Sequence, residues 1–397
     1  MVALITIGRL YEQFLGYSQT DSMALSGHAD TPTRCGLDVT LFDDAYRGRR
    51  VLVTGHTGFK GSWLALWLNK LGANVIGVAL PPATSPNHWD LLQLRIPDYR
   101  VDIRDRLTLT KFVNDAQPDA VFHLAAQPLV RRSYRDPLET WSTNVLGTAN
   151  LLDACNHTPS VRAIVAATSD KCYENKEWQR GYRETDRLGG HDPYSASKAA
   201  AELVVASYRT SFFHVPGAPL VATARAGNVV GGGDWSEDRL IPDVVRSVAA
   251  NARLEIRSPD STRPWQHVLE SLSGYLQLGS KLLSGRTDVA EAWNFGPGPE
   301  GNRSVADVLG RLRVYWPGLT WVATEQAQPH EANLLYLDCT KARSQLGWRP
   351  AWSLEQALAA TASWYQSFEH HGEVESRAQL DAYILAAHAA GIPWAAS

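Results

Sequence analysis

The chain has 397 residues, of which 44% are apolar and 20% are charged, and its formal net charge is -3 at pH 7. This length is enough to bury a large core, and the near balance of charges argues against a protein that binds nucleic acid or an anionic membrane. The 4 cysteines are far apart and fit neither a disulfide framework nor a metal site, so we expect a cytoplasmic protein with no metal. No apolar run approaches the roughly 20 residues that span a bilayer.

The first 45 residues differ in composition from the rest of the chain. They include TDSMALSGHADTPTRCG, which is rich in Ser, Thr, Gly and Asp and has no sustained periodicity. We expect residues 1–45 to form a leader outside the fold, and the sequence does not indicate its role.

From Arg50, short apolar runs alternate with helical stretches. The runs are RVLVTG, ANVIGVAL, DAVFHLAA, AIVAATS and LVATARAGNV, and the main helical stretches are SWLALWLNKLG, PLETWSTNVLGTANLLDAC and PYSASKAAAELVVASYRTSFF. In the first helix, Leu64, Trp67, Leu68 and Leu71 recur at helical spacing, so one face should pack on the sheet. This alternation predicts an α/β fold with a doubly wound, Rossmann-type parallel sheet. The looser pattern after Gly231 predicts a smaller, interleaved α/β domain.

A glycine motif follows the first apolar run directly. In GHTGFKG, three glycines stand three residues apart before a helix, where backbone N–H groups and the helix dipole favour a pyrophosphate. The acidic residue that usually binds the ribose is missing from VALPPATS, and no Arg replaces it, so this stretch does not separate NAD from NADP. The motif predicts a dinucleotide site, with Gly55, Thr57, Gly58, Phe59, Lys60 and Gly61 as its residues.

Tyr194 and Lys198 in PYSASK are four residues apart, so a helix places both on one face. A nearby ammonium, helped by the positive nicotinamide ring of an oxidised cofactor, favours the phenolate and makes Tyr194 a base near neutral pH. Such pairs also occur by chance on ordinary helices. Ser169, at the end of an earlier strand, is expected to bind the substrate oxygen from which Tyr194 takes a proton. This favours the catalytic interpretation.

The segment TSDKCY places Asp170 and Lys171 just after a buried strand. Active sites of open α/β sheets collect at the carboxyl ends of strands, so an acid and a base are expected there. The alternative is a solvated ion pair on a loop.

Taken together, these motifs resemble the extended short-chain dehydrogenase/reductase family, and in it the sugar-nucleotide 4,6-dehydratases. The resemblance runs from Arg50 to Trp364 and beyond, through VTGHTGFKGSWL, HLAAQPLVR, STNVLGT, TSDKCY, GGHDPYSASK, RAGNVVGGGDW and RPWQHVLE. Most of these dehydratases carry Thr-Asp-Glu where this chain has Ser169, Asp170 and Lys171. Those that act on CDP-glucose share TSDKCY.

The resemblance implies NAD as the cofactor, CDP-glucose as the substrate and a 4-keto-6-deoxy sugar as the product, made for deoxysugars of surface polysaccharides such as O-antigen. Tyr194 would be the base at the 4-hydroxyl, Asp170 the acid for the 6-hydroxyl, and Asn144 a supporting amide. Lys171 would replace the usual Glu as the base at C5 or orient that base. The alternative is a structural Lys171, with water or Tyr194 acting at C5.

Other site residues follow from the same resemblance, although each is also compatible with ordinary packing or a surface ion pair. The cofactor would contact Asp102, Ile103, Ala125, Ala126 and Gln127. The sugar nucleotide would contact Asn228, Arg239, Leu240 and Arg263, with Trp235 or Trp265 beside the base and His330 or Glu331 as further candidates. We place the NAD-binding domain at 46–225, with some later segments, and the sugar-nucleotide domain mainly at 226–397.

The family also pairs through the helices that carry Asn144 and Tyr194, so we expect a homodimer or homotetramer. Two other functions remain open. A sugar-nucleotide 4-epimerase would need Tyr194 and Lys198 but has no use for Asp170. A non-catalytic NAD-binding regulator would need neither Tyr194 nor Lys198.

Overall fold

The structure is a computed structural model, and it describes residues 40–324 and 333–396. The chain divides into two compact units, Met1–Asp38 and Val39–Ser397, and the described residues belong to the second. Within these described ranges, no helix is long and apolar enough to cross a membrane.

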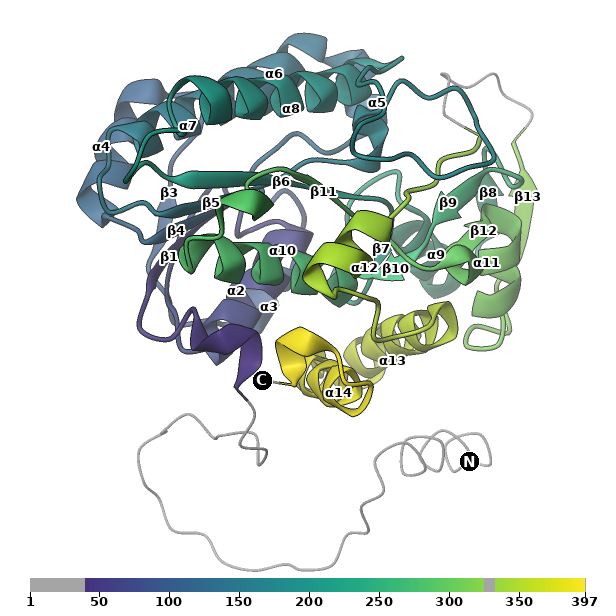
Figure 1. The fold of residues 1–397 in the computed structure, drawn as a ribbon. Coiled ribbons are helices and arrows are strands. Elements are labelled where there is room, and N and C mark those ends of the chain that lie inside the picture. Colours follow the sequence, from purple (N-terminus) through teal and green to yellow (C-terminus); the bar gives the residue numbers. More distant parts are fainter. Residues whose placement is uncertain (1–39, 325–332, 397) are drawn as a thin grey trace, which may run out of the picture. The chain divides into compact units, whose positions relative to one another are not determined.

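A seven-stranded parallel sheet forms the centre of this unit, with strand order β11-β6-β5-β4-β1-β2-β3 (Figure 1). The strands are β1 Arg50–Thr54, β2 Asn74–Ala79, β3 Asp98–Arg100, β4 Ala120–His123, β5 Ala163–Ala167, β6 Leu220–Ala226 and β11 Ala292–Phe295. The order reverses between β1 and β4, which is the position where open α/β sheets bind ligands. The predicted Rossmann-type fold is confirmed.

Helices cover both faces of this sheet (Figure 1). One face carries α4 Arg106–Ala116, α6 Pro137–Trp141, the π-helical turn η2 Ser142–Leu146, α7 Gly147–Asn156 and α8 Pro193–Ser211. The other carries α2 Phe59–Lys70, α3 His88–Leu92 and α10 Val268–Leu283. Each face of the sheet has its own hydrophobic core, and alternate residues of β1 pack in the two cores. Leu52 lies in one core, and Val51 and Val53 lie in the other.

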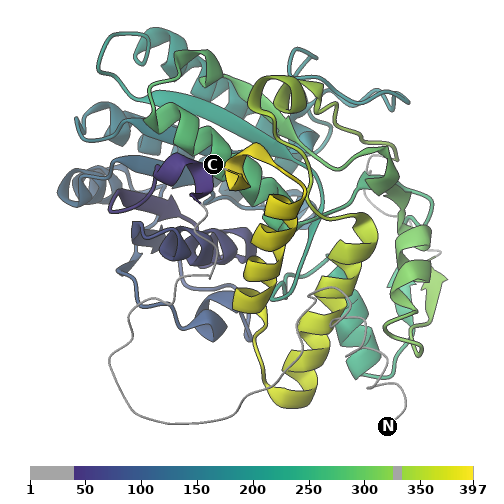
Figure 2. The same ribbon diagram turned by 60° about the horizontal axis from the view of Figure 1, so that its bottom comes forward.

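Helix α2 is buried on more sides than its apolar stripe predicts. All eight residues from Gly61 to Leu68 are buried, because α14 (Ser376–Ala389) covers the side that faces away from the sheet. The Trp67 ring meets Tyr383 of α14 at a centroid distance of 5.6 Å. The C-terminal helix therefore completes the core around the glycine-motif helix. Figure 2 shows α14 beside α13 (Leu354–His371), in yellow and yellow-green.

The packed core begins before residue 45, the boundary that the sequence suggested for the leader. Phe42 is buried and its ring stacks on Trp394, with centroids 4.8 Å apart and ring planes 6° apart. The Tyr46 hydroxyl donates a hydrogen bond to the Leu276 carbonyl of α10. These residues join the two ends of the described chain.

A smaller part follows β6 and contains three two-stranded sheets, β10-β7, β12-β9 and β13-β8. Its elements are β7 Val229–Val230, α9 Leu240–Ala249, β8 Leu254–Ile256, β9 Thr262–Pro264, β10 Gln266–His267, β12 Asn302–Ser304, α11 Val305–Leu312, β13 Trp321–Ala323 and α13. The short elements not yet named are η1 Leu41–Asp44, α5 Val130–Arg135, η3 Asp170–Cys172, η4 Thr287–Val289, η5 Pro299–Gly301, α12 Thr340–Leu346 and η6 Pro393–Ala395. Because α10 and β11 return to the large sheet, the two parts are interleaved along the chain. The exact domain boundaries remain a prediction.

Candidate active site

The glycine motif forms a turn so tight that side chains are excluded from it. Gly55 has a φ of +76°, and a Cβ there would lie 2.6 Å from the Ala125 nitrogen. A Cβ on Gly61 would lie 2.1 Å from the Gly55 carbonyl oxygen. Gly58 is the N-cap of α2, so the backbone N–H groups of the first helical turn lie at this bend. The cradle fits the pyrophosphate of a dinucleotide.

We expect Gly61→Ala to weaken both folding and NAD binding. The new methyl group overlaps backbone atoms that cannot move aside cheaply, so the free energy of unfolding should fall by about 1–3 kcal/mol. Thermal melting and calorimetric titration with NAD would measure the two effects. Gly310→Ala in α11 is a matched control, because a Cβ there meets nothing within 4 Å, and it should leave NAD affinity unchanged. Equal NAD affinity in wild type and Gly61→Ala would contradict the assignment of the cradle.

The other predicted cofactor residues lie at the carboxyl ends of neighbouring strands. The Thr57 hydroxyl donates to the Leu80 carbonyl at 2.9 Å, which fixes the turn after β1 to the end of β2. The Ala125 N–H donates to the Thr54 hydroxyl at 3.2 Å, and Ala126 follows in the same segment. Ile103 is buried in close contact with Gly147. The Asp102 carboxylate accepts from Arg104 at 2.6 Å, so it is engaged by the chain itself.

Asn144 lies in the π-helical turn η2, a local distortion that is often found at functional sites. Its amide oxygen accepts from the Gln127 N–H at 2.8 Å. Its amide nitrogen donates to the Gln127 carbonyl at 3.0 Å and to the Ser197 hydroxyl at 2.9 Å. Asn144 therefore joins the segment after β4 to the helix of Tyr194 and Lys198, in keeping with a supporting amide.

Ser169 and Asp170 are buried together at the end of β5. The Ser169 hydroxyl donates to Asp170 Oδ1 at 3.0 Å, whereas Asp170 Oδ2 has no hydrogen-bond partner among the described residues. Burial raises the pKa of Asp170, although the positive charge of Lys171 opposes this shift. A buried carboxyl group with a raised pKa and one free oxygen is suited to donate a proton.

Tyr194 and Lys198 lie on the buried side of α8, and the Tyr194 hydroxyl shares a hydrogen bond with Ser169. Burial raises the pKa of Tyr194 to about 12, although the Ser169 hydrogen bond opposes this shift. Burial also lowers the pKa of Lys198 to about 8. A phenolate near neutral pH was predicted with the oxidised cofactor bound, and it stays a prediction. The positive nicotinamide ring of oxidised NAD would favour the phenolate further.

The side chain of Lys60 extends from the glycine motif towards the predicted catalytic residues. Its ammonium group donates to the Tyr275 hydroxyl of α10 at 3.2 Å. Burial lowers its pKa to about 7, and the nearby charges of Arg239, Asp170 and Lys198 also act on it. Lys60 therefore lies between the predicted cofactor and substrate residues, a position that the glycine motif does not reveal.

The predicted phosphate-binding residues are Arg239, Arg263 and Asn228. Arg239 donates to Asp234 at 3.0 Å and stands just before α9, which begins at Leu240. Arg263 is buried, donates to the Thr262 carbonyl at 3.0 Å, and its charge lowers the pKa of Asp170. Both arginines thus act electrostatically on predicted catalytic groups, Arg239 on Tyr194 and Arg263 on Asp170. The Asn228 carbonyl accepts from Gln266 at 3.3 Å.

The two tryptophans proposed beside the base are held by packing. The Trp235 ring meets Trp364, Tyr365 and Phe368 of α13 at 5.5–5.9 Å. Trp265 is buried and donates to the Arg303 carbonyl at 2.9 Å. These contacts give no support to base stacking by either ring. His330 and Glu331 lie outside the described residues.

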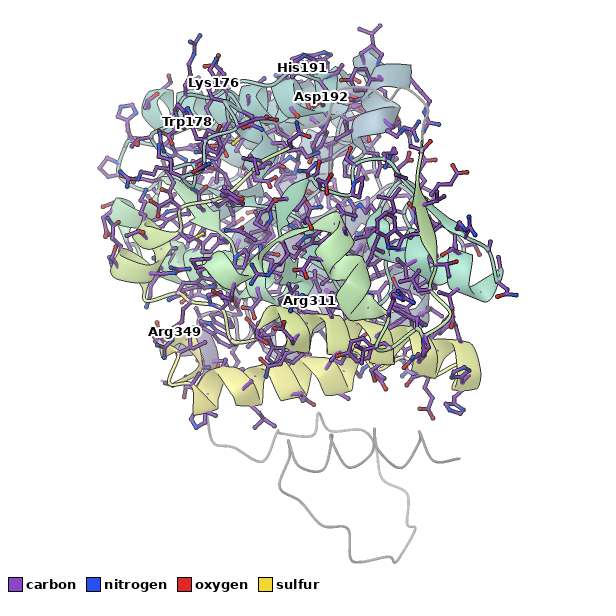
Figure 3. All side chains as sticks on the ribbon, turned by 90° about the vertical axis from the view of Figure 1, so that its right-hand side faces the viewer. Lys176, Trp178, His191, Asp192, Arg311 and Arg349 are labelled. Atoms are coloured by element: carbon purple, nitrogen blue, oxygen red, sulfur yellow. The ribbon has the colours of Figure 1, made fainter. Side chains whose placement is uncertain are left out.

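The segment between η3 and α8 crosses the end of the molecule where Lys176, Trp178, His191 and Asp192 are found (Figure 3). The exposed Trp178 ring stacks on Tyr182 at 5.4 Å, and Tyr182 stacks on the buried Tyr173 at 5.2 Å. At its other end, Asp192 caps α8 by accepting from the Ser195 N–H at 2.9 Å. Both ends of the segment are therefore anchored beside predicted catalytic residues.

Residues 51–295 match the NAD dependent epimerase/dehydratase family. The chain belongs to this family. The resemblance predicted from the motifs is confirmed, and so is NAD as the cofactor of the family.

Among curated members of the family, the CDP-glucose 4,6-dehydratase of Salmonella typhimurium is 46% identical over 333 residues, which cover 81% of this chain and 92% of that protein. A dTDP-glucose 4,6-dehydratase of Xanthomonas campestris is 29% identical and covers 79% of this chain and 92% of its own length.

Solved structures of family members have the same fold. An epimerase of Methanothermobacter thermautotrophicus has a TM-score of 0.74 at 26% identity, covering 83% of this chain and 95% of that one. The dTDP-glucose 4,6-dehydratase of Streptomyces venezuelae, solved with NAD bound, has a TM-score of 0.69 at 27% identity, covering 82% and 99%.

Two further residues in this site were not singled out from the sequence, the buried ion pair of Glu202 and Arg225. Glu202 follows Lys198 by four residues, so the same spacing that relates Tyr194 to Lys198 could have identified it. Arg225 lies at the end of β6 and carried no signal beyond its place in an apolar strand.

Proposed function

We propose that this family member is a CDP-glucose 4,6-dehydratase, which makes CDP-4-dehydro-6-deoxyglucose and water. The observation that carries this proposal is Asp170, a buried acid with one oxygen free of partners among the described residues, beside Ser169 and Tyr194. A 4-epimerase has no step that needs such an acid. The 46% identity to the Salmonella typhimurium enzyme supports the choice of CDP-glucose.

The glycine cradle and the residues after β4 would hold NAD. When bound, NAD would accept the hydride from C4 and return it to C6 after water is lost, while C5 regains a proton. The raised pKa of Tyr194 suits a group that stays protonated until positive charge is brought near it.

The residues of the chain then have separate roles. Tyr194 takes the proton from the 4-hydroxyl, and the Ser169 hydroxyl binds the same oxygen. The new 4-keto group acidifies the hydrogen at C5. Asp170 protonates the 6-hydroxyl as it leaves, so that water is expelled. The charge of Lys171 acts to lower the pKa of Asp170. This proximity supports a role for Lys171 in the elimination step, as the C5 base or as the group that orients it.

Incubation with NAD and CDP-glucose tests this function, with dTDP-, UDP- and GDP-glucose as parallel substrates. The absorbance of the 4-keto-6-deoxy product in alkali should appear with CDP-glucose. Signal with another nucleotide sugar alone would overturn the choice of cytosine as the nucleobase but would still support the dehydratase reaction. Interconversion at C4 with no keto product would establish the epimerase instead.

We also propose that the chain pairs through the helices on the α8 side of the sheet. Large apolar side chains are exposed there, with Leu138 at 77%, Leu146 at 61% and Leu203 at 61%. Apolar exposure of this extent on neighbouring helices is typical of an interface. The sequence prediction of a homodimer or homotetramer is consistent with this face.

We expect Leu138→Glu to shift the chain towards the monomer, because a buried, unpaired carboxylate opposes association. Sedimentation velocity would measure the change. Val314→Glu is the control, because Val314 is equally exposed, at 77%, just after α11 in the smaller part. A wild type that is already monomeric at micromolar concentration would overturn the proposed interface.

A further inference from the structure

Glu202 is a buried carboxylate on the catalytic helix with no role in the mechanism above. It follows Lys198 by four residues, and Lys198 follows Tyr194 by four, so the three side chains share one face of α8. All three are buried.

Among the described residues, the hydrogen bonds of the Glu202 carboxylate come from β6 and from the residue just after β5. It accepts from Arg225 Nε at 2.9 Å and Nη2 at 2.8 Å, and from the Thr223 hydroxyl at 2.8 Å. It also accepts from the hydroxyl of Thr168, the residue just before Ser169. Glu202 thus fixes the end of β5 to the catalytic helix.

Arg225 extends this arrangement to the other side of the site. Its Nη1 donates to the Tyr173 hydroxyl at 2.8 Å, and that hydroxyl donates to Asn294 of β11 at 2.7 Å. The segment from Thr168 to Tyr173, which contains Asp170, is therefore held at both ends by the Glu202 and Arg225 pair.

Glu202 also acts electrostatically on Lys198. Burial lowers the pKa of Lys198, and Glu202 is the carboxylate that opposes this shift, together with the Cys172 thiol of η3. Two cationic or titratable groups face Lys198 from other elements, Lys60 of α2 and His123 of β4. Although burial raises the pKa of Glu202, the Arg225 guanidinium and the hydrogen bonds bring it below its usual range. The carboxylate therefore stays charged near neutral pH.

We propose that Glu202 is a positioning residue of the reaction, which holds the Lys198 ammonium charged and, through Thr168, keeps Ser169 and Asp170 in register with Tyr194. It acts through these residues and does not touch the reacting atoms. The inference rests on hydride transfer with a Tyr and Lys pair, which the epimerases of the family share with the dehydratases. It can therefore be tested with whichever sugar nucleotide reduces the bound cofactor.

The experiment compares the pH profile of kcat in wild type, Glu202→Gln, Glu202→Asp and the double variant Glu202→Gln with Arg225→Met. The single Gln variant leaves a buried guanidinium without its partner and risks failing to fold, whereas removing both charges is often tolerated. Glu270→Gln is the matched control, because Glu270 is equally buried on α10 but bonds to Tyr383 and Trp352 instead.

The wild-type kcat should fall on the alkaline side as Lys198 loses its proton. In the double variant, we expect the midpoint of this fall to move down by about 1 pH unit or more, with KM nearly unchanged. Glu202→Asp should restore much of the wild-type profile, and Glu270→Gln should not move it. A folded double variant with the wild-type profile would overturn the proposal. Absence of turnover by wild type with CDP-glucose alone would count against the proposed substrate and not against Glu202.

Discussion

Tyr194→Phe should lower kcat by about 10²–10⁴-fold, the range that a positioned acid or base contributes. The substitution keeps the ring and removes only the hydroxyl that bonds to Ser169, so NAD affinity and folding should change little. Single-turnover absorbance at the wavelength of reduced NAD would show the loss at the hydride step, because the 4-hydroxyl proton has no acceptor.

Tyr208→Phe, on the same helix, is the control for this experiment. Tyr208 is partly exposed and packs against Phe212 and Phe213 away from the site, so its loss of a hydroxyl should leave kcat unchanged. A Tyr194→Phe variant that reduces NAD at the wild-type rate would show that another group takes the proton.

Asp170→Asn should separate the two halves of the reaction. We expect product formation to fall by about 10²–10⁴-fold, because Asn cannot protonate the leaving 6-hydroxyl. Reduction of NAD should persist, because Tyr194 and Lys198 are intact. Rapid-quench analysis would therefore find accumulated 4-keto sugar that still carries its 6-hydroxyl. If hydride transfer and water loss slow equally, Asp170 is not the acid.

The same variant should be at least as stable as the wild type. Burial raises the pKa of Asp170. The ionised carboxylate therefore disfavours the folded state at every pH above the pKa that Asp170 has in the unfolded chain. Asn removes that cost, and the melting temperature near pH 7 should stay equal or rise. This result would fit a group kept for function at the expense of stability. A large loss of stability would indicate a structural role instead.

The sequence predicted the parts of the fold that local patterns determine. Gly55 and Gly61 were identified because a tight turn after a strand requires glycine, and the structure shows backbone contacts that leave no room for a Cβ. The burial of α2 on all sides was not predicted, because it depends on α14, more than 300 residues later in the chain.

Within the site, spacing placed Tyr194 and Lys198 together, but it did not predict their ionisation. The pKa of Tyr194 is raised because the ring is buried, and burial is a property of the tertiary structure. Arg225 illustrates the same limit, since a charged residue inside an apolar strand reveals its role only when its partner on α8 is known.

The most direct test of a 4,6-dehydratase is the fate of the hydrogen at C4. CDP-glucose carrying deuterium at C4 should give a 4-keto-6-deoxy product with that deuterium at C6, detected by NMR or mass spectrometry. Internal return of the hydride to C6 requires oxidation of the sugar at C4, with Tyr194 as the base, and water elimination, with Asp170 as the acid, in the same site. Deuterium recovered at C4 of an epimerised sugar, with none at C6, would contradict the account.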